Sequence, residues 1–566
     1  MPLAIELAAA RVKVLDIATI AERIGERFAL LQRGPRDAPL RHQTLQHAID
    51  WSYDLLTDDE QILFRRLAVF AGGCTLEAVE AIGADLNADT AVLELLTTLV
   101  DKSLLLRQAQ GRDTPRFTQF ESILAYGWQK LSENGEVAAI QANHAHYFLE
   151  LAEQAEPMLY GSEQARWLAR LGAEHDNLRA ALLWLIKCGD ASMAARLGIA
   201  LWHFWYILSH HLEGMTWLEQ ILALELSTEH RAKILYGLGM LARRIHEDEI
   251  TYQRLTEALD LFYQIEDDYG IASTLRVLGR LDFRRGQRQP AQEKLSTALH
   301  FFRQANNDEG VAVTLANLGT FYMGQTDWMS AHQFFEESLA IRRRTGNHNG
   351  IANCLDALGF MAIHQGKYEA AKRLLAESQQ LYQALGNNQA TSTPIFFRAA
   401  LAYIEKAYVE AEALYRQAYA YAEACGSQHL ICEFQIYLAL TSLRLGNGNQ
   451  AFKLVANALA YFGNSTSIDN LTLSLAVFSL IALAAKHTAC GLRVAARALQ
   501  MQRYGRVQLL CSTIMHELAE AITIVHAQMN DGGIATFQSE GETMPLNELV
   551  AIALGLATKI SSVGNQ

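Results

Sequence analysis

A repetition of 40 residues is the feature that most restricts what this chain can fold into. Gly270, Gly310 and Gly350 are spaced 40 residues apart, and their surroundings recur with them. Counted from each glycine, apolar or small residues return at offsets of one, two, five, eight and nine, which is the spacing of one face of a helix. A second apolar stripe starts at offset 21 with alanine in five successive units: Ala291, Ala331, Ala371, Ala411 and Ala451. Each unit is therefore predicted to be a pair of helices.

Glycines at two other offsets indicate how the two helices of a unit meet. Between the two stripes, at offset 16, three units carry Gly286, Gly366 and Gly446, and a tight or left-handed turn is least costly at glycine. At offset nine the glycine lies inside a helix, where it costs about 1 kcal/mol relative to alanine. This position is occupied by Gly239, Gly279, Gly319 and Gly359. We predict that close helix contact offsets that cost, and we count about six units.

The repeated unit resembles a known family. The segment GVAVTLANLGTFYMGQTDWMSAHQFFEESLAIRRRTGN, residues 310–347, is similar to tetratricopeptide repeats (TPRs), in a version longer than the usual unit of about 34 residues. It looks like the TPR region of MalT-type bacterial regulators. The resemblance implies a right-handed α-solenoid whose concave surface binds a peptide, a protein or a small effector.

Upstream of the repeats, short helices and two strands are predicted. Thr57 to Glu60 reads TDDE, an N-capping box, after a helix that ends near Leu56. Gly72 and Gly73 are predicted to stop the next helix, and Thr75 and Thr90 are placed to cap two more. Candidate strands at 104–108 and 116–120 flank a turn at 111–113. Helices followed by a hairpin predict a winged helix.

This region resembles the winged-helix module of STAND signalling NTPases, which are NB-ARC-like ATPases. The segment EHDNLRAALLWLIKCGD, residues 174–190, is similar to the helical connector of AfsR-like regulators. The first residues, MPLAIELAAARV, resemble the Gly-Leu-Pro-Leu-Ala motif that follows the nucleotide-binding core in that family. The resemblance implies that Pro2 is a remnant of a nucleotide site and that the P-loop core is missing from this chain.

The predicted fold is mainly all-α and has five parts. They are a remnant helical segment at 1–34, a winged-helix domain at 41–135, a helical connector at 136–229, TPR-like repeats at 230–485 and a C-terminal helical cap at 486–566.

Matches to nucleotide-binding, metal-binding and catalytic motifs are weak. Gly366-Lys367 is the one Gly-Lys pair, and its place at a predicted turn argues against a P-loop. The histidine pairs at 144/146 and 210/211 and the pair His516-Glu517 lack zinc-site spacing. The aromatic residues at 202, 204, 205 and 217 are expected to be core, and the basic run 342–344 is expected to be a solvated helix end. We expect no catalytic residue, cofactor or metal site, and no enzymatic activity.

Charge and cysteine content restrict the partners. The net charge is -13, which disfavours a general nucleic-acid or membrane-surface binder. The seven scattered cysteines contain no C-x-x-C pair and are expected to be buried, reduced thiols, and no signal peptide is recognised, so a cytoplasmic protein is predicted. The longest uncharged run, 470–485, is too short to cross a bilayer and is predicted to be a buried helix.

Two functions remain open from the sequence. The favoured one is a regulatory module whose repeats bind a protein or effector and whose winged helix relays that state to an NTPase core that is encoded elsewhere or has been lost. The alternative is a transcriptional regulator that reads DNA with the winged helix. Residues 1–134 contain 14 Lys and Arg against 19 Asp and Glu, and the predicted helix 91–103 has one lysine, which favours the first. An enzyme with an unrecognised site is a third, weaker alternative.

Overall fold

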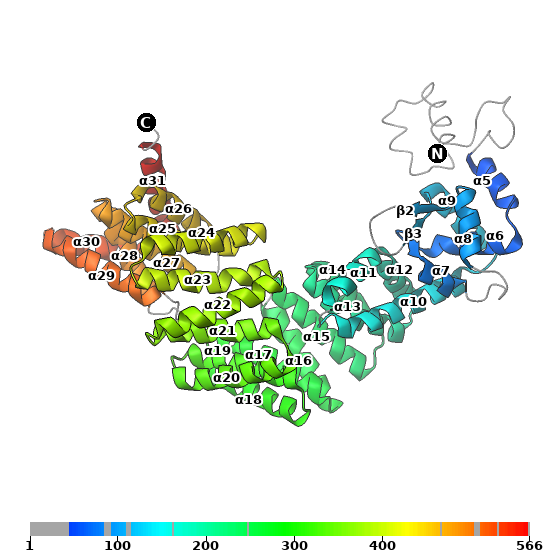
Figure 1. Cartoon of the computed structure of the whole chain (residues 1–566), viewed down its shortest axis with the longest axis horizontal. Coiled ribbons are helices and arrows are strands. Elements are labelled where there is room, and N and C mark those ends of the chain that lie inside the picture. The colour runs from blue at the N-terminus through cyan, green and yellow to red at the C-terminus, as the bar shows by residue number, and fades with distance from the viewer. Residues whose placement is uncertain are drawn as a thin grey trace, which may run out of the picture. The chain divides into compact units, whose positions relative to one another are not determined.

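A computed structural model describes most of the chain as helices α5 to α31 with one small sheet (Figure 1). The described residues are 45–83, 92–108, 115–160, 163–245, 248–464, 467–502, 510–528 and 531–563. They divide into two compact units at residues 274 and 275, and each unit is considered by itself. The predicted remnant at 1–34 with Pro2, the cap Thr90 and the turn at 111–113 lie outside the described residues.

The first unit opens with the expected winged helix. Its elements are α5 (Leu45–Asp54), α6 (Asp58–Arg66), the 3-10 turn Leu67–Val69, β1 (Cys74–Thr75), α7 (Leu76–Ile82), α8 (Val92–Asp101), β2 (Leu106–Gln108) and β3 (Arg116–Thr118). The antiparallel sheet has the order β1-β3-β2, so Phe117 of β3 lies opposite both Cys74 and Arg107. Thr57 and Glu60 form the predicted capping box, and the Thr75 hydroxyl accepts from the Ala78 amide at the start of α7.

One helix end differs from the prediction. Helix α6 ends at Arg66 and not at the glycine pair. Gly72 and Gly73 instead have φ of +77° and +91°, and they turn the chain into β1, a strand that the sequence did not predict. A Cβ on Gly73 would lie 2.6 Å from the Phe117 carbonyl oxygen. Glycine is required there because the turn packs directly on β3.

Helices then continue to the end of the first unit. They are α9 (Glu121–Glu133), α10 (Val137–Met158), α11 (Gln164–Ala173), α12 (His175–Cys188), α13 (Ala191–Ile207), α14 (His211–Leu222), α15 (Thr228–Arg244) and α16 (Asp248–Gln264). Helix α10 contacts α12 and α13, and α13 contacts α15. The pair α15 and α16 is the first hairpin in phase with the repeat.

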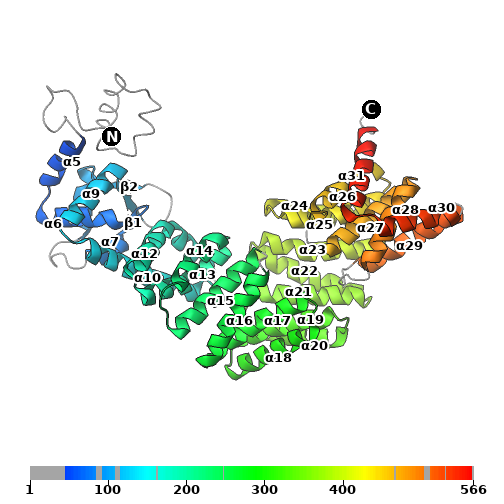
Figure 2. The ribbon, with the colours of Figure 1, turned by 180° about the vertical axis from the view of Figure 1, so that it is seen from behind.

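Helix α17 (Asp268–Arg284) leads into the second unit, where the hairpins stack in chain order (Figures 1 and 2). The remaining repeat helices are α18 (Arg288–Gln304), α19 (Asp308–Met323), α20 (Trp328–Thr345), α21 (His348–His364), α22 (Tyr368–Ala384), α23 (Asn388–Ile404), α24 (Tyr408–Ala424), α25 (Gln428–Arg444), α26 (Gly448–Phe462), α27 (Ile468–Ala484) and α28 (Thr488–Gln502). Regular pairing therefore continues past residue 485. The predicted domain limits remain predictions.

From the hairpin of α17 and α18 onward, the turn inside each repeat hairpin uses a left-handed residue, as predicted at offset 16. Gly286, Gly366 and Gly446 have φ of +78°, +70° and +82°. The same position is left-handed where the sequence has no glycine, at Thr326, Lys406 and Lys486. The turn geometry therefore follows from the stacking of the helices, and glycine lowers its cost in alternate units.

The offset-nine glycines are packing positions, as predicted. A Cβ on Gly239 would lie 2.7 Å from Leu255, and one on Gly359 would lie 2.7 Å from Leu375. Gly279 and Gly319 face the corresponding Leu295 and Phe335 at 2.9 and 2.8 Å. Each glycine lets the two helices of its hairpin approach at one point.

Three helices follow the last hairpin: α29 (Cys511–Gln528), α30 (Asp531–Thr543) and α31 (Leu546–Val563). Helix α27 is buried along its length, as expected for the uncharged run. Within the part of the chain that the structure describes, no helix is long and apolar enough to cross a membrane. Cys74, Cys354 and Cys432 are buried, but Cys188 and Cys425 are exposed at helix ends, so the expectation of buried thiols is wrong for these two.

Candidate functional site

Helix α8 is the element that a winged helix would place against a partner. Leu95, Leu96 and Leu99 face the core, which leaves Leu93, Glu94, Thr97 and Asp101 exposed. The Thr97 and Thr98 hydroxyls donate to carbonyls one turn earlier, at 2.7 and 3.1 Å. The exposed face of α8 is thus apolar and acidic, which suits a protein partner better than the negative edge of DNA.

Cations near this face are engaged elsewhere. Lys102, directly after α8, donates to the Glu60 carboxylate at 3.0 Å and to the Leu55 carbonyl. Arg116, in the wing strand β3, is ion-paired with Glu174 from the connector. Arg107 on β2 is exposed. The described residues of the winged helix therefore present few free cations to a phosphate backbone, Arg107 being one of them.

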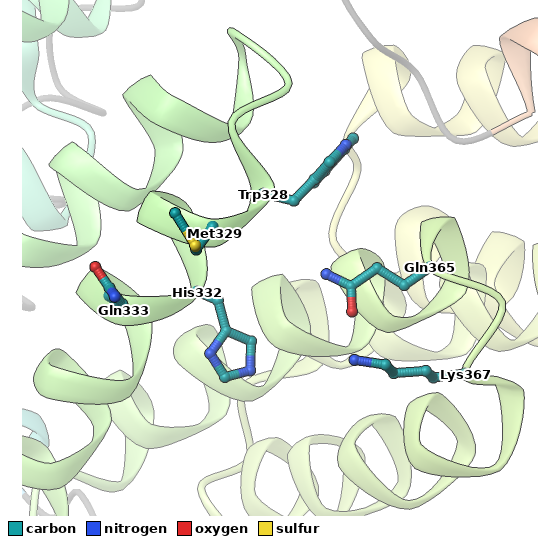
Figure 3. Close-up of a pocket in the computed structure, with 6 residues that line it drawn as sticks. All are labelled: Trp328, Met329, His332, Gln333, Gln365 and Lys367. Carbon is teal, nitrogen blue, oxygen red and sulfur yellow. The ribbon is translucent and has the colours of Figure 1, made fainter.

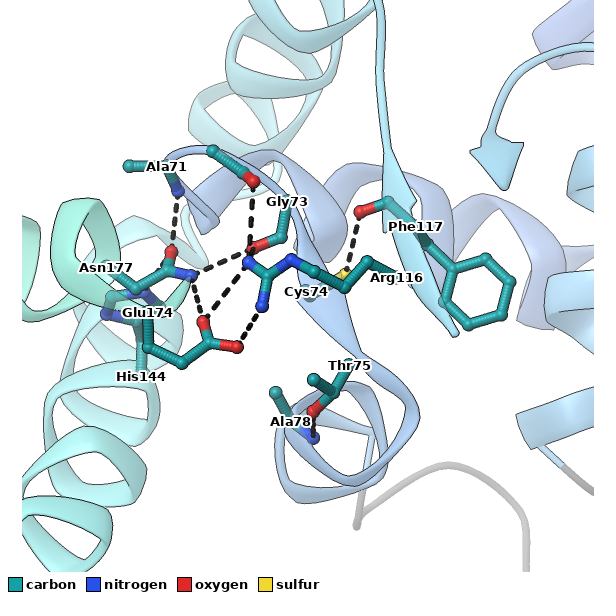
Figure 4. A network of polar contacts seen from close by, with 11 residues as sticks. Ala71, Gly73, Cys74, Thr75, Ala78, Arg116, Phe117, His144, Glu174 and Asn177 are labelled. Carbon is teal, nitrogen blue, oxygen red and sulfur yellow. Dashed lines mark hydrogen bonds and ion pairs between the residues drawn. The ribbon is translucent and has the colours of Figure 1, made fainter. Parts of the chain in front are cut away.

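A buried polar network ties the winged helix to the connector (Figure 4). Glu174 and Asn177, at the start of α12, are 3% and 0% exposed. The Asn177 side chain accepts from the Ala71 amide and donates to the Gly73 carbonyl and to Glu174, each at 2.8 Å. The Arg116 guanidinium also donates to the Gly73 carbonyl, at 3.2 Å. The turn before β1 is therefore held by side chains that lie about a hundred residues further along the chain.

His144 of α10 completes this network. Its Nε2 lies 3.4 Å from Asn177 Oδ1, and its ring packs on Phe70 and Phe148. Burial lowers the pKa of His144 to about 4, although the contact with Asn177 acts in the opposite direction. The ring is therefore neutral at pH 7. It serves as a hydrogen-bonding and packing partner, and not as an acid.

The second candidate surface is the inner face of the repeats, formed by the odd-numbered helices. Helices α19, α21 and α23 contact one another in sequence, as do α25 and α27, more extensively than the even-numbered repeat helices from α18 to α28 contact one another. An aromatic row runs along this face. Phe360 packs on Phe397 at 5.5 Å between ring centroids, and Phe396 packs on Phe434 and Tyr437 at 5.4 and 4.8 Å.

The inner face changes character along the array. In the earlier hairpins it carries exposed polar positions, such as Thr320 on α19 and Asn353 on α21. In the later hairpins it is apolar and buried, because α29 packs against α27 and its Glu517 bonds to Tyr403 of α23 and Arg444 of α25. Exposed surface for a partner is thus concentrated at the earlier hairpins.

An open depression lies at the edge of the array (Figure 3). Its side chains come from the start of α20 and from the turn after α21: Trp328, Met329, His332, Gln333, Gln365 and Lys367. Trp328 stacks on His364 at 5.0 Å, whereas Met329 is 74% exposed. The Gly366-Lys367 pair lies in this turn, as predicted, and no phosphate loop is formed there.

The remaining sequence candidates are structural. Phe204 and Trp205 are buried, and Trp202 and Trp217 pack against the same core, as expected. The expectation of a solvated basic run is wrong for Arg342, which is buried and donates to the Gly350 carbonyl at 2.7 Å, because it occupies the place that Phe302 takes one unit earlier. Arg343 and Arg344 are exposed. Nowhere in the described ranges do three His, Cys, Asp or Glu side chains converge as metal ligands.

Two family models match the chain at these places. The winged helix-turn-helix domain matches residues 56–132, and the tetratricopeptide repeat matches residues 310–384. The chain combines a winged helix-turn-helix domain with tetratricopeptide repeats. This is the combination of domains that the sequence predicted.

Curated relatives match part of this winged-helix and TPR chain. A Mycobacterium tuberculosis protein whose name describes an HTH-type transcriptional regulator is 42% identical over 250 residues, which are 43% of this chain and 28% of that protein. An uncharacterised protein of the same species is 37% identical over 147 residues, 25% of this chain and 37% of its own length. The match thus spans 28% and 37% of the length of these two relatives.

One solved structure covers nearly the whole winged-helix and TPR chain. It is a signal transduction ATPase with numerous domains (STAND) from Pyrococcus horikoshii, described as having a tetratricopeptide repeat sensor. The match has a TM-score of 0.58 at 15% identity and covers 91% of this chain and 73% of that one. At this identity the likeness shows a shared fold.

Proposed function

We propose that the chain is a non-catalytic regulatory module, in which the inner face of the TPR array binds a protein or peptide and the winged helix relays the bound state through protein contacts. The observation that carries the proposal is the exposed face of α8. Leu93, Glu94, Thr97 and Asp101 supply no cation to a DNA backbone and no long donor to base edges.

The connector gives the relay a physical route. The network of Arg116, Glu174 and Asn177 fixes the winged helix to α12, and α10, α13 and α15 continue the packing toward the first hairpin. A change in the first hairpin would therefore act on a winged helix that is bonded to its neighbour and not loosely tethered.

The proposal extends to partners and location. The resemblance to STAND regulators, and the P. horikoshii ATPase of similar fold, support a separate NTPase core as the receiver of the signal. No cofactor is needed for such a role, and the cytoplasm is proposed as its location because a reducing compartment suits the seven free cysteines. The alternative is DNA binding, which is favoured by the M. tuberculosis relative named as an HTH-type transcriptional regulator and by the exposed Arg107 of the wing strand.

The test of the inner face uses two arginine substitutions in one hairpin. A displayed library of random peptides is selected on the purified chain, and the best binder is measured by fluorescence anisotropy. Thr320→Arg on α19 is expected to weaken binding at least tenfold, about 1.4 kcal/mol, because it places a long cation on the inner face. Ala340→Arg, at an exposed position of the paired helix α20, is expected to change the affinity less than twofold. Equal losses in both variants, or a library without binders, would refute the proposal.

A further inference from the structure

Helix α29 differs from the other C-terminal helices in the side of the array that it covers. Helix α30 packs on α28, and α31 packs on α26 and α28, all of them even-numbered helices. Helix α29 packs mainly on α27, with a smaller contact on α28, and reaches α25 and α23 of the inner face. Both views show α29 beside α27 (Figures 1 and 2). It therefore covers the later part of the inner face, beyond the earlier hairpins whose inner face is exposed.

A polar cluster anchors α29 on the inner face. The Tyr403 hydroxyl lies 3.0 Å from both Glu517 carboxylate oxygens, and Arg444 Nη2 lies 2.5 Å from Glu517 Oε2. Arg444 Nε also donates to the Tyr403 oxygen at 3.1 Å. Two repeats thus supply a cation and a hydroxyl that converge on a single carboxylate. We call the surface made by α27, Tyr403 and Arg444 the α29 site.

The apolar contacts of α29 come from one face. Its buried side chains are Ile514, Met515, Leu518 and Ile522, which lie on one stripe of a helix. The opposite face carries Ile524, which is 59% exposed, and the exposed pair His516 and Glu520. In α27, by comparison, every residue from 470 to 483 is buried. Helix α29 is therefore attached along one stripe, as a bound amphipathic peptide would be.

We propose that the α29 site is a helix-binding site and that α29 is an internal occupant which a partner helix displaces. The partner that fits is an amphipathic helix with apolar residues spaced like 514, 515, 518 and 522 and a carboxylate at the position of Glu517. The inference deepens the proposed function, because it names the partner class and the regulation of the same inner face.

Competition from within the chain sets the size of the expected effect. A tethered helix competes at an effective concentration in the millimolar range. A free peptide with micromolar affinity for the vacant site would then bind the parent chain roughly a thousandfold more weakly. Loosening α29 should expose the site without changing its lining.

The experiment measures binding of a labelled synthetic peptide, residues 512–528, to full-length chains by fluorescence anisotropy. Glu517→Arg in the chain is expected to loosen α29, because Arg444 then faces a like charge, and to tighten peptide binding at least thirtyfold over the parent. The double variant Arg444→Glu with Glu517→Arg restores an opposite-charge pair and is expected to return weak binding. Glu520→Arg, on the exposed face, should behave like the parent. Equal affinity of the parent and Glu517→Arg, or no binding by either, would overturn the proposal.

Hydrogen exchange distinguishes a displaceable α29 from an α29 that is a permanent part of the folded array. In Glu517→Arg the amides of α29 are expected to exchange faster while those of α27 keep their parental rates. Faster exchange in α27 as well would show that α29 is part of the core, and the proposal would be wrong. If library peptides respond to Thr320→Arg but the 512–528 peptide never binds, the proposed function stands and the inference about α29 fails. If the 512–528 peptide binds as expected but library peptides do not respond to Thr320→Arg, the α29 site stands and the function proposed for the earlier hairpins fails.

Discussion

Glu174→Ala is expected to destabilise the first unit by about 3–5 kcal/mol, because it leaves the Arg116 guanidinium buried without its anion. The side chains of Arg116 and Glu174 are 14% and 4% exposed, so water cannot easily replace the lost partner. Asn177 would also lose one of its four hydrogen bonds. Urea unfolding followed by tryptophan fluorescence measures the change.

A surface glutamate close by in the sequence provides the control. Glu163 pairs with Arg166, but the two side chains are 51% and 82% exposed. Glu163→Ala is therefore expected to change stability by less than about 0.5 kcal/mol. If the two alanine variants unfold at the same urea concentration, the network does not hold the winged helix to the connector.

Gly359→Leu should lower the stability of the repeat array by about 3 kcal/mol, at the upper end of overpacking costs. A Cβ at this position already lies 2.7 Å from a Leu375 methyl group, so a whole leucine side chain must push α21 and α22 apart. Gly319→Leu is expected to act in the same way, because its Cβ would lie 2.8 Å from the Phe335 ring. Thermal melts followed by circular dichroism measure the loss.

The control for this substitution is Gly448→Leu, at the start of α26, where an added Cβ has no neighbour within 4 Å. That variant is expected to melt within about 1 °C of the parent, because leucine favours the helix more than glycine does. If Gly359→Leu melts as the control does, close packing is not the role of the offset-nine glycine.

The helices of the repeats were predictable because each one repeats the same local pattern. The apolar stripes, the offset-nine glycines and the glycine turns all depend on residues within one unit of 40. The left-handed turns at Thr326, Lys406 and Lys486 could not be predicted from the sequence, because threonine and lysine do not favour a positive φ. There the packing of two helices imposes a backbone conformation that the local sequence disfavours.

The polar clusters could not be predicted, because they join residues that are far apart in the chain. Glu174 meets Arg116 across 58 residues, and Glu517 meets Tyr403 across 114. Glu517 had been considered next to His516 as a zinc motif, and the structure gives it the partners Tyr403 and Arg444 instead. Arg342 was misjudged for the same reason, since its burial depends on Gly350 in the next helix. Spacing within a helix predicts which face is apolar, but it does not predict which polar groups meet after folding.

The most direct test of the central claim, that the winged helix acts through protein contacts, is a selection of randomised duplex DNA on the purified chain at about 150 mM salt. We expect that no sequence is enriched, because the exposed face of α8 carries Glu94 and Asp101 and no cation, and because Arg116 and Lys102 are ion-paired within the protein. Enrichment of one duplex sequence, with binding that is lost on changing Thr97 or Arg107, would contradict the account and establish a DNA-reading regulator.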